Sequence, residues 1–249
     1  MEKSPNLREE EKAGTLNSIL DVEDIHTFIG QYHILQGVSL SVSQGSITAL
    51  LGRNGAGKTT TLKSILGLTP PSDGQVLFNG QPISGMHSYD IAALGIGFVP
   101  EHRAIFRDLT VGENLKIAER RSGDLAHKES LIFGLFPDLK RLIHLPGNHL
   151  SGGQQQMLAI ARALVADNQL LLIDEPSEGL APVIIENLIE AIRQLSNEST
   201  ILLVEQNFIV ARQLAEYYVI IEEGRSVRSG KMIDLVDDAA TIHRYLGAA

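Results

Sequence analysis

A glycine-rich loop between an apolar run and a helical pattern constrains the fold of this chain more than any other feature. The apolar run is Ile47–Leu51, and the loop behind it reads Gly-Arg-Asn-Gly-Ala-Gly-Lys-Thr from Gly52 to Thr59. Its three glycines let the backbone curl so that successive N–H groups point into one concavity. A helix starting directly behind the loop adds partial positive charge at the same point. Strand, loop and helix together predict a phosphate-binding site.

The residue types in the loop assign a part to each position. We predict that the Lys58 ammonium reaches the β- and γ-phosphates of a nucleotide and that the Thr59 hydroxyl binds Mg²⁺. The predicted nucleotide-binding residues are Gly52, Arg53, Asn54, Gly55, Ala56, Gly57, Lys58, Thr59 and Thr60.

Composition excludes several classes of function. The net charge of −9 argues against nucleic acid as the main partner, and the absence of cysteine excludes disulfides and thiolate chemistry. No apolar run approaches the ~18 residues of a membrane span. Residues 1–18 are polar and lack the apolar segment of a signal peptide. We therefore expect a polar extension over residues 1–18, a single large domain over residues 19–249, and a cytoplasmic location.

Alternating strand and helix patterns predict an α/β fold with a mostly parallel sheet. Alternating residues over 19–25 and 38–42 and a hairpin signal over 76–83 add an antiparallel β flank. Residues 101–165 form an inserted helical unit, with helices predicted over 111–121, 129–136 and 152–166. The core and the β flank then comprise residues 19–100 and 166–249.

Two acidic residues, Asp174 and Glu175, stand at the end of the apolar run that begins at Leu170. A continuous apolar run of this length is typical of a strand covered on both faces, and ligands of doubly wound sheets bind at the carboxyl ends of such strands. We predict that Asp174 orients Mg²⁺ and that Glu175 polarises the attacking water.

A second anion-binding helix start is predicted at Ser151-Gly152-Gly153-Gln154. Ser151 can cap the helix that follows, and the two glycines leave its first amides uncovered. One nucleotide does not need two such sites. The pattern therefore indicates that this loop serves the γ-phosphate of a nucleotide held by another subunit.

In this order the motifs resemble those of the ATP-binding subunit of an ABC transporter, from about Leu20 to Leu246. The resemblance implies a P-loop NTPase (RecA-like) core with a β-subdomain and a helical subdomain. It also implies two subunits that hold two ATP molecules head to tail, each between the phosphate loop of one subunit and the Ser151–Gln154 signature loop of the other.

Three departures from the general ABC pattern indicate which group of ABC proteins the chain resembles. Glu101 stands where the family usually has a glutamine that senses Mg²⁺ and the membrane partner, so Glu101 is a predicted metal ligand. Gln206 replaces the usual histidine, and the loop after Glu175 ends in proline rather than aspartate. The motifs P-E-x-R, E-P-S-x-G-L-A-P and V-E-Q-N resemble ATP-binding proteins of branched-chain (hydrophobic) amino-acid uptake. Parts of the two phosphate-site motifs are also similar to urea and short-amide importers, which remain the alternative.

The catalytic set predicted from these motifs is Glu175, Gln206 and Lys58. Gln206 can offer an amide N–H to a γ-phosphate oxygen but cannot act as an acid or a base. For adenine stacking, Ile29 stands where relatives carry tyrosine, and the nearby aromatics are Phe28 and Tyr32. Either could stack on a base, and core packing explains both equally well.

The resemblance also implies partners. These are a second ABC ATPase subunit (a copy or, as it favours, a paralogue), integral membrane permease subunits and, indirectly, a solute-binding protein, at the cytoplasmic face of the bacterial inner membrane. A soluble ABC ATPase of chromosomes or ribosomes would show long heptad runs or two cassettes in one chain, and neither pattern is present. A regulatory module without turnover would lack Lys58 or Glu175.

Overall fold

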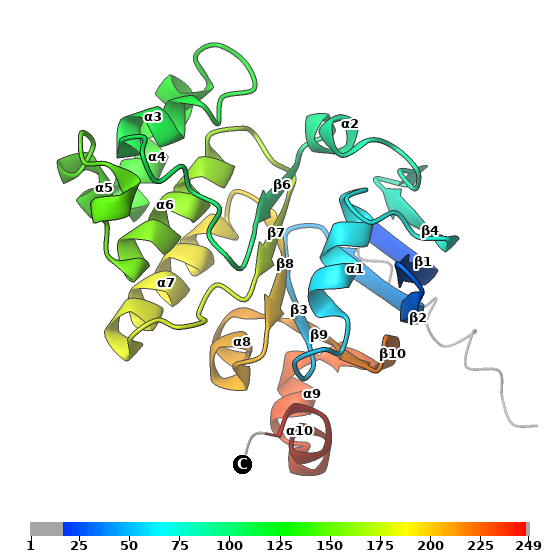
Figure 1. Ribbon diagram of the computed structural model, residues 1–249. Helices are drawn as coiled ribbons and strands as arrows, with labels where there is room; N and C mark the ends of the chain where they lie inside the picture. The colour runs from blue at the N-terminus through cyan, green and yellow to red at the C-terminus, as the bar shows by residue number, and fades with distance from the viewer. Residues whose placement is uncertain (1–16, 248–249) are drawn as a thin grey trace, which may run out of the picture.

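Two sheets organise the chain in the computed structural model, which describes residues 17–247 (Figure 1). The smaller sheet is antiparallel, has the order β2-β1-β4-β5, and consists of β1 (Ser18–Ile29), β2 (Tyr32–Ser43), β4 (Asp73–Phe78) and β5 (Gln81–Pro82). The larger has the order β10-β9-β3-β8-β7-β6 and consists of β3 (Ile47–Leu51), β6 (Ile96–Val99), β7 (Leu170–Asp174), β8 (Thr200–Glu205), β9 (Tyr217–Glu222) and β10 (Arg225–Lys231). Its five strands β6, β7, β8, β3 and β9 run parallel, and β10 pairs antiparallel with β9. The predicted α/β fold with an antiparallel flank is confirmed.

Each central strand is buried on both faces, which explains its continuous apolar sequence. Because side chains alternate along a strand, Ala49 and Leu51 of β3 join the core on one face of the sheet, whereas Leu50 joins a core shared with α1 and the smaller sheet. The helices on the first face are α6 (Gly152–Leu164), α7 (Pro182–Leu195) and α8 (Phe208–Leu214), and α1 (Lys58–Ile65) covers the second.

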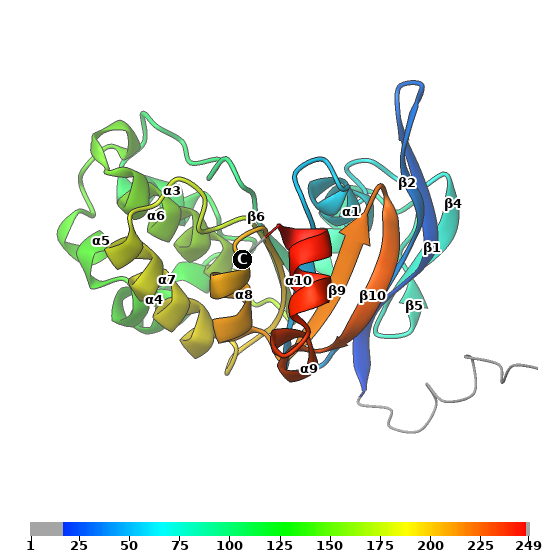
Figure 2. The same ribbon diagram turned by 90° about the horizontal axis from the view of Figure 1, so that it is seen from below.

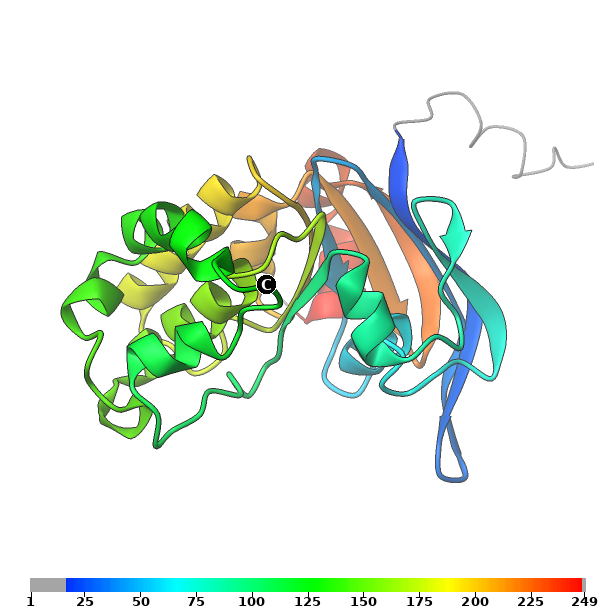
Figure 3. The ribbon, with the colours of Figure 1, turned by 90° about the horizontal axis from the view of Figure 1, so that it is seen from above.

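The helices of the inserted region gather at one side of the molecule (Figure 3). They are α3 (Val111–Lys116), α4 (Asp124–Leu135), α5 (Pro137–Arg141), a short 3₁₀ helix (Gly147–His149) and α6. Helix α6 contacts both α3 and β6, so it connects this group to the larger sheet. The remaining helices are α2 (Ser88–Ala93), α9 (Met232–Val236) and α10 (Ala239–Leu246).

Several element boundaries differ from the predicted ones. The helix predicted over 111–121 ends at Lys116, because the Asp124 carboxylate accepts hydrogen bonds from the backbone N–H groups of Arg120 and Arg121. Gly123, in the left-handed region at φ 99°, then begins α4 five residues earlier than the pattern indicated.

Helices α2 and α5 were not predicted. Pro137 reads as a helix breaker in the sequence, but it occupies the first turn of α5, where its missing N–H has no partner to lose.

Strands β1 and β2 are longer than their alternating patterns and project as a hairpin beyond the body of the protein (Figure 2). Its turn is at Gly30, and its tip exposes Phe28, Ile29 and Tyr32. Residues 1–16 of the predicted N-terminal extension lie outside the described part. Within residues 17–247, every helix is too short or too polar to cross a membrane.

Candidate active site

A cavity of about 420 Å³ lies at the carboxyl ends of β3 and β7. It is lined by Ile34, Asn54, Gly55, Gly57, Lys58, Thr59, Thr60, Glu101, Glu175 and Glu178. The fold therefore brings the predicted phosphate loop together with Glu175 and Glu101, although more than a hundred residues of chain separate the loop from Glu175.

The phosphate loop needs glycine at two positions for steric reasons. A Cβ atom on Gly52 (φ 154°) would lie 2.4 Å from the Ile221 carbonyl oxygen, and one on Gly57 (φ 110°) would lie 2.8 Å from Leu35 Cδ2. Gly57 is also the N-cap of α1 and provides no side-chain cap. The first amides of α1 thus have no side-chain acceptor and are open to an anion in the cavity.

Lys58 is 4 % exposed, and its ammonium is held by the protein's own acceptors. Nζ donates to the carbonyl oxygens of Gly52 (2.9 Å) and Arg53 (3.2 Å) and forms an ion pair with Glu175 Oε1 at 3.0 Å. The two residues predicted to bind phosphate and to activate water therefore contact each other directly.

The predicted metal ligands lie together beside this pair. Thr59 Oγ1 donates to Asp174 Oδ1 at 3.2 Å, and Asp174 is 1 % exposed. Burial raises the pKa of the Asp174 carboxyl to about 6; the negative charges of Glu175 and Glu101 act in the same direction, against the hydrogen bond from Thr59.

A hydroxyl and carboxylates are the hard oxygen ligands that Mg²⁺ prefers, usually one or two of them together with substrate phosphates. Within residues 17–247, no three acidic or histidine side chains converge closely enough to hold a metal by themselves. The donor set therefore fits Mg²⁺ that arrives with a nucleotide.

Gln206 follows the end of β8, the strand next to β7, and is exposed. It is not one of the residues that line the cavity. Its backbone neighbours are well fixed, because the Asn207 side chain caps α8 by accepting from the amides of Ile209 and Val210.

The second predicted anion site lies at the start of α6, among the inserted helices and away from α1 (Figure 1). Ser151 Oγ accepts from the Gln154 amide, and Gln154 Oε1 accepts from the Ser151 amide at 2.9 Å, which is a complete capping box. The helix start predicted from the sequence is confirmed. None of its residues lines the cavity of the same chain.

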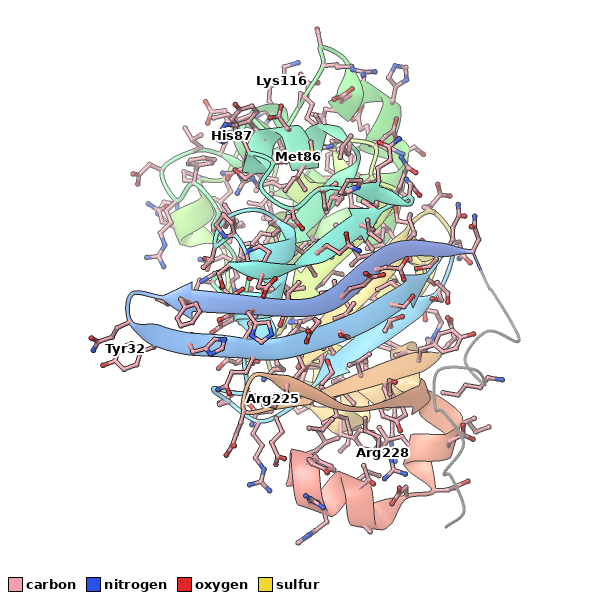
Figure 4. All side chains as sticks on the ribbon, turned by 90° about the vertical axis from the view of Figure 1, so that its right-hand side faces the viewer. Tyr32, Met86, His87, Lys116, Arg225 and Arg228 are labelled. Carbon is pink, nitrogen blue, oxygen red and sulfur yellow. The ribbon has the colours of Figure 1, made fainter. Side chains whose placement is uncertain are left out.

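The aromatic candidates lie on the β1–β2 hairpin. Phe28 stacks on the ring of His33 with centroids 4.2 Å apart, and Tyr32 is 67 % exposed at the tip, pointing away from the body (Figure 4). Neither lines the cavity, whereas Ile34 of the same hairpin does. Ile34 and Glu178 were not among the predicted site residues, since their positions depend on how β2 and the loop after β7 pack against the phosphate loop.

Comparisons with known proteins agree with this geometry. The family model described as ABC transporter matches residues 35–178, more than half of the chain. The high-affinity branched-chain amino acid transport ATP-binding protein BraG of Pseudomonas aeruginosa is 38 % identical over 232 residues, which cover 92 % of this chain and all of that protein. The probable branched-chain amino acid transport ATP-binding protein LivF of Archaeoglobus fulgidus is 37 % identical over 211 residues, covering 83 % of this chain and 89 % of that protein.

A solved structure extends the similarity to three dimensions. A dimeric ATP-binding cassette in a post-hydrolysis state, bound to ADP and Pi, matches with a TM-score of 0.75 at 25 % identity, covering 86 % of this chain and 98 % of that one. Its motifs, its fold and these similarities show that the chain belongs to the ABC transporter family, as an ATP-binding subunit whose ATP hydrolysis is coupled to transport.

Proposed function

We propose that this chain is the ATP-hydrolysing subunit of an importer for branched-chain amino acids. The observation that supports this solute most strongly is the similarity to BraG, which spans that protein's whole length. The motif V-E-Q-N at residues 204–207 and the Glu178–Pro182 segment resemble the same group.

Binding of ATP would begin with an exchange of partners at Lys58. In the protein alone, the ammonium is held by two loop carbonyls and by Glu175. The phosphates of ATP offer more negative charge at the same place, and the amides at the start of α1 favour that charge. When Lys58 turns toward the phosphates, Glu175 is released to accept a hydrogen bond from water.

The carboxyl edge of the sheet then provides the remaining groups. Thr59, Asp174 and Glu101 would hold Mg²⁺, which when bound neutralises phosphate charge. Glu175 would orient the water, and the Gln206 amide would donate to a γ-phosphate oxygen. Because Gln206 cannot take up a proton, Glu175 is the group on which proton removal depends.

The start of α6 would complete the site of another cassette. Its uncovered glycine amides suit a γ-phosphate, yet they lie away from the phosphate loop of their own chain. We therefore propose a head-to-tail pair with a second ABC ATPase subunit, docked peripherally on membrane permease subunits that work with a solute-binding protein.

Uptake of labelled leucine and labelled urea tests the solute in cells that carry Lys58→Ala at the native locus. Lys63→Ala is the matched control, because Lys63 is exposed on the same helix. Lys58→Ala should abolish useful ATP binding by the purified protein and leucine uptake by the cells, with urea uptake intact, while Lys63→Ala leaves all three unchanged. Loss of urea uptake alone would instead assign the chain to a urea importer, and loss of neither would exclude both solutes.

A further inference from the structure

A buried carboxylate that the scheme above does not use lies one strand away from Asp174. Glu205 is the last residue of β8 and is 1 % exposed. Its Oε1 accepts from the Ser177 amide at 3.2 Å. Its Oε2 accepts from the Ser177 hydroxyl at 3.1 Å and from the Asn207 amide at 3.2 Å. Glu205 is therefore an acceptor of three hydrogen bonds from two separate segments.

These two segments carry the two groups proposed to act on the γ-phosphate. Ser177 lies two residues after Glu175, and Asn207 directly follows Gln206. A backbone bond from the Glu175 N–H to the Val204 carbonyl oxygen (2.9 Å) ties the same segments a second time. The Glu205 side chain thus joins the loop of the proposed base to the loop of the proposed γ-phosphate donor.

The backbone at Glu175 requires such support. Its φ is 42°, in the left-handed region that non-glycine residues avoid unless the surrounding structure holds them there. Next to it, Ser177 is 7 % exposed and bonds to Glu205 through both its amide and its hydroxyl. A shift of Ser177 would be transmitted through Pro176 to Glu175.

Burying a carboxylate is energetically unfavourable, so a side chain needed only to fill space here would be apolar. Burial raises the pKa of Glu205 to about 7, which reflects the penalty on its charged form. Glutamate can accept from all three donors at once, which no apolar residue of similar size can do.

We propose that Glu205 is a positioning residue for ATP hydrolysis, which holds Glu175 and Gln206 in fixed relation to each other. The inference rests on the proposed roles of those two residues. Glu205 acts through Ser177 and Asn207 and does not itself reach the nucleotide. The phosphate loop is built from β3 and α1, so ATP binding should depend little on Glu205.

The test is steady-state ATP hydrolysis by the purified full-length protein with Glu205→Gln. Glutamine keeps the size but replaces one acceptor oxygen by a donor, so at least one of the three bonds is lost. We expect kcat to fall about tenfold or more and the KM for ATP to change by less than about twofold, because misplacement affects the reacting groups and not the phosphate cradle. Ser177→Ala should lower kcat in the same way, and the double variant should be no slower than Glu205→Gln.

The matched control is Glu216→Gln. Glu216 Oε2 also accepts from a backbone amide, that of Ile47 at 3.0 Å, but at the opposite end of β3. The kcat of Glu216→Gln should equal that of the parent protein. This would show that loss of a carboxylate–amide bond is not by itself enough to slow turnover.

Two results would overturn the inference. One is a parental kcat in both Glu205→Gln and Ser177→Ala. The other is a kcat that falls only in proportion to ATP affinity and thermal stability, which would make Glu205 structural. The Glu175→Gln variant distinguishes a failure of this inference from a failure of the proposed function. If Glu175→Gln hydrolyses ATP at the parental rate, Glu175 is not the base, and the inference about Glu205 fails with it.

Discussion

Charged side chains crowd the carboxyl edge of the larger sheet. Lys58, Asp174 and Glu205 are each at most 4 % exposed, and Glu175 pairs with Lys58. Burying charged groups is unfavourable unless they are paired or hydrogen-bonded, and here each of the four has such a partner. For Lys58, Asp174 and Glu175, a bound nucleotide with its cation would offset part of this cost by providing opposite charge.

The raised pKa of Glu205 predicts how stability varies with pH. The pKa is about 7 in the folded protein against an ordinary value of 4.5, with burial as the largest cause and the charge of Glu175 as a minor one. Between these values the folded state binds more protons than the unfolded state, so the unfolding free energy falls as pH rises from 4.5 to about 7. Full ionisation costs about 3 kcal/mol.

Glu205→Gln removes this dependence. The difference in unfolding free energy between the variant and the parent should shift in favour of the variant by up to about 3 kcal/mol from pH 4.5 to pH 7 and then level off. Urea unfolding of both proteins without nucleotide, at a series of pH values, measures the shift. A constant difference would contradict the raised pKa.

At the scale of elements, three helix starts show what capping does and does not imply. Helices α3 and α6 both begin with a full capping box, Thr110 with Glu113 and Ser151 with Gln154, whereas α1 begins without a side-chain cap. A cap stabilises a helix wherever it occurs. Function at α6 therefore has to be separated from stability.

Ser151→Ala and Thr110→Ala make that separation. Each should lower the unfolding free energy by about 1 kcal/mol through loss of the cap. Only Ser151→Ala should also lower ATP turnover, since only α6 is proposed to face a γ-phosphate. Urea unfolding and ATP hydrolysis of both variants measure this, and equal turnover would show that Ser151 is a structural cap alone.

At the scale of the whole molecule, the two proposed half-sites of the chain do not meet. The phosphate loop and Glu175 form one cavity, and the start of α6 lies among the inserted helices on the far side of the sheet (Figure 1). The proposed site would therefore be completed by two cassettes in head-to-tail arrangement.

Glu175→Gln should trap that arrangement. The variant keeps Lys58 and the phosphate loop, so it should bind ATP while lacking the group proposed to polarise water. In light scattering, the variant should have the mass of two chains with ATP and the mass of one chain with ADP. A single mass with ATP would show that copies of this chain do not pair with each other, which would leave a different cassette as the partner.

Local patterns in the sequence determined much of this protein. The glycine-rich loop between β3 and α1, the acidic pair at the end of β7 and the Ser151 cap lie where local patterns put them, and the α/β fold with its antiparallel flank followed from strand and helix patterns. Such features depend on neighbouring residues, whose periodicity, glycines and caps are written along the chain. The predicted end of α3 and the predicted start of α4 were wrong, because the Asp124 carboxylate and the Gly123 backbone outweighed a periodic pattern.

The tertiary structure alone decided the contacts between distant segments. The Lys58–Glu175 ion pair, the Thr59–Asp174 bond and the position of Ile34 in the cavity bring together residues of α1, β2 and the end of β7, which are far apart in the sequence. Glu205 reads in the sequence as an ordinary acid at a strand end, and only the parallel pairing of β7 with β8 sets it against Ser177. Strand order and register arise from burial summed over the whole core, and no single stretch of sequence contains that sum.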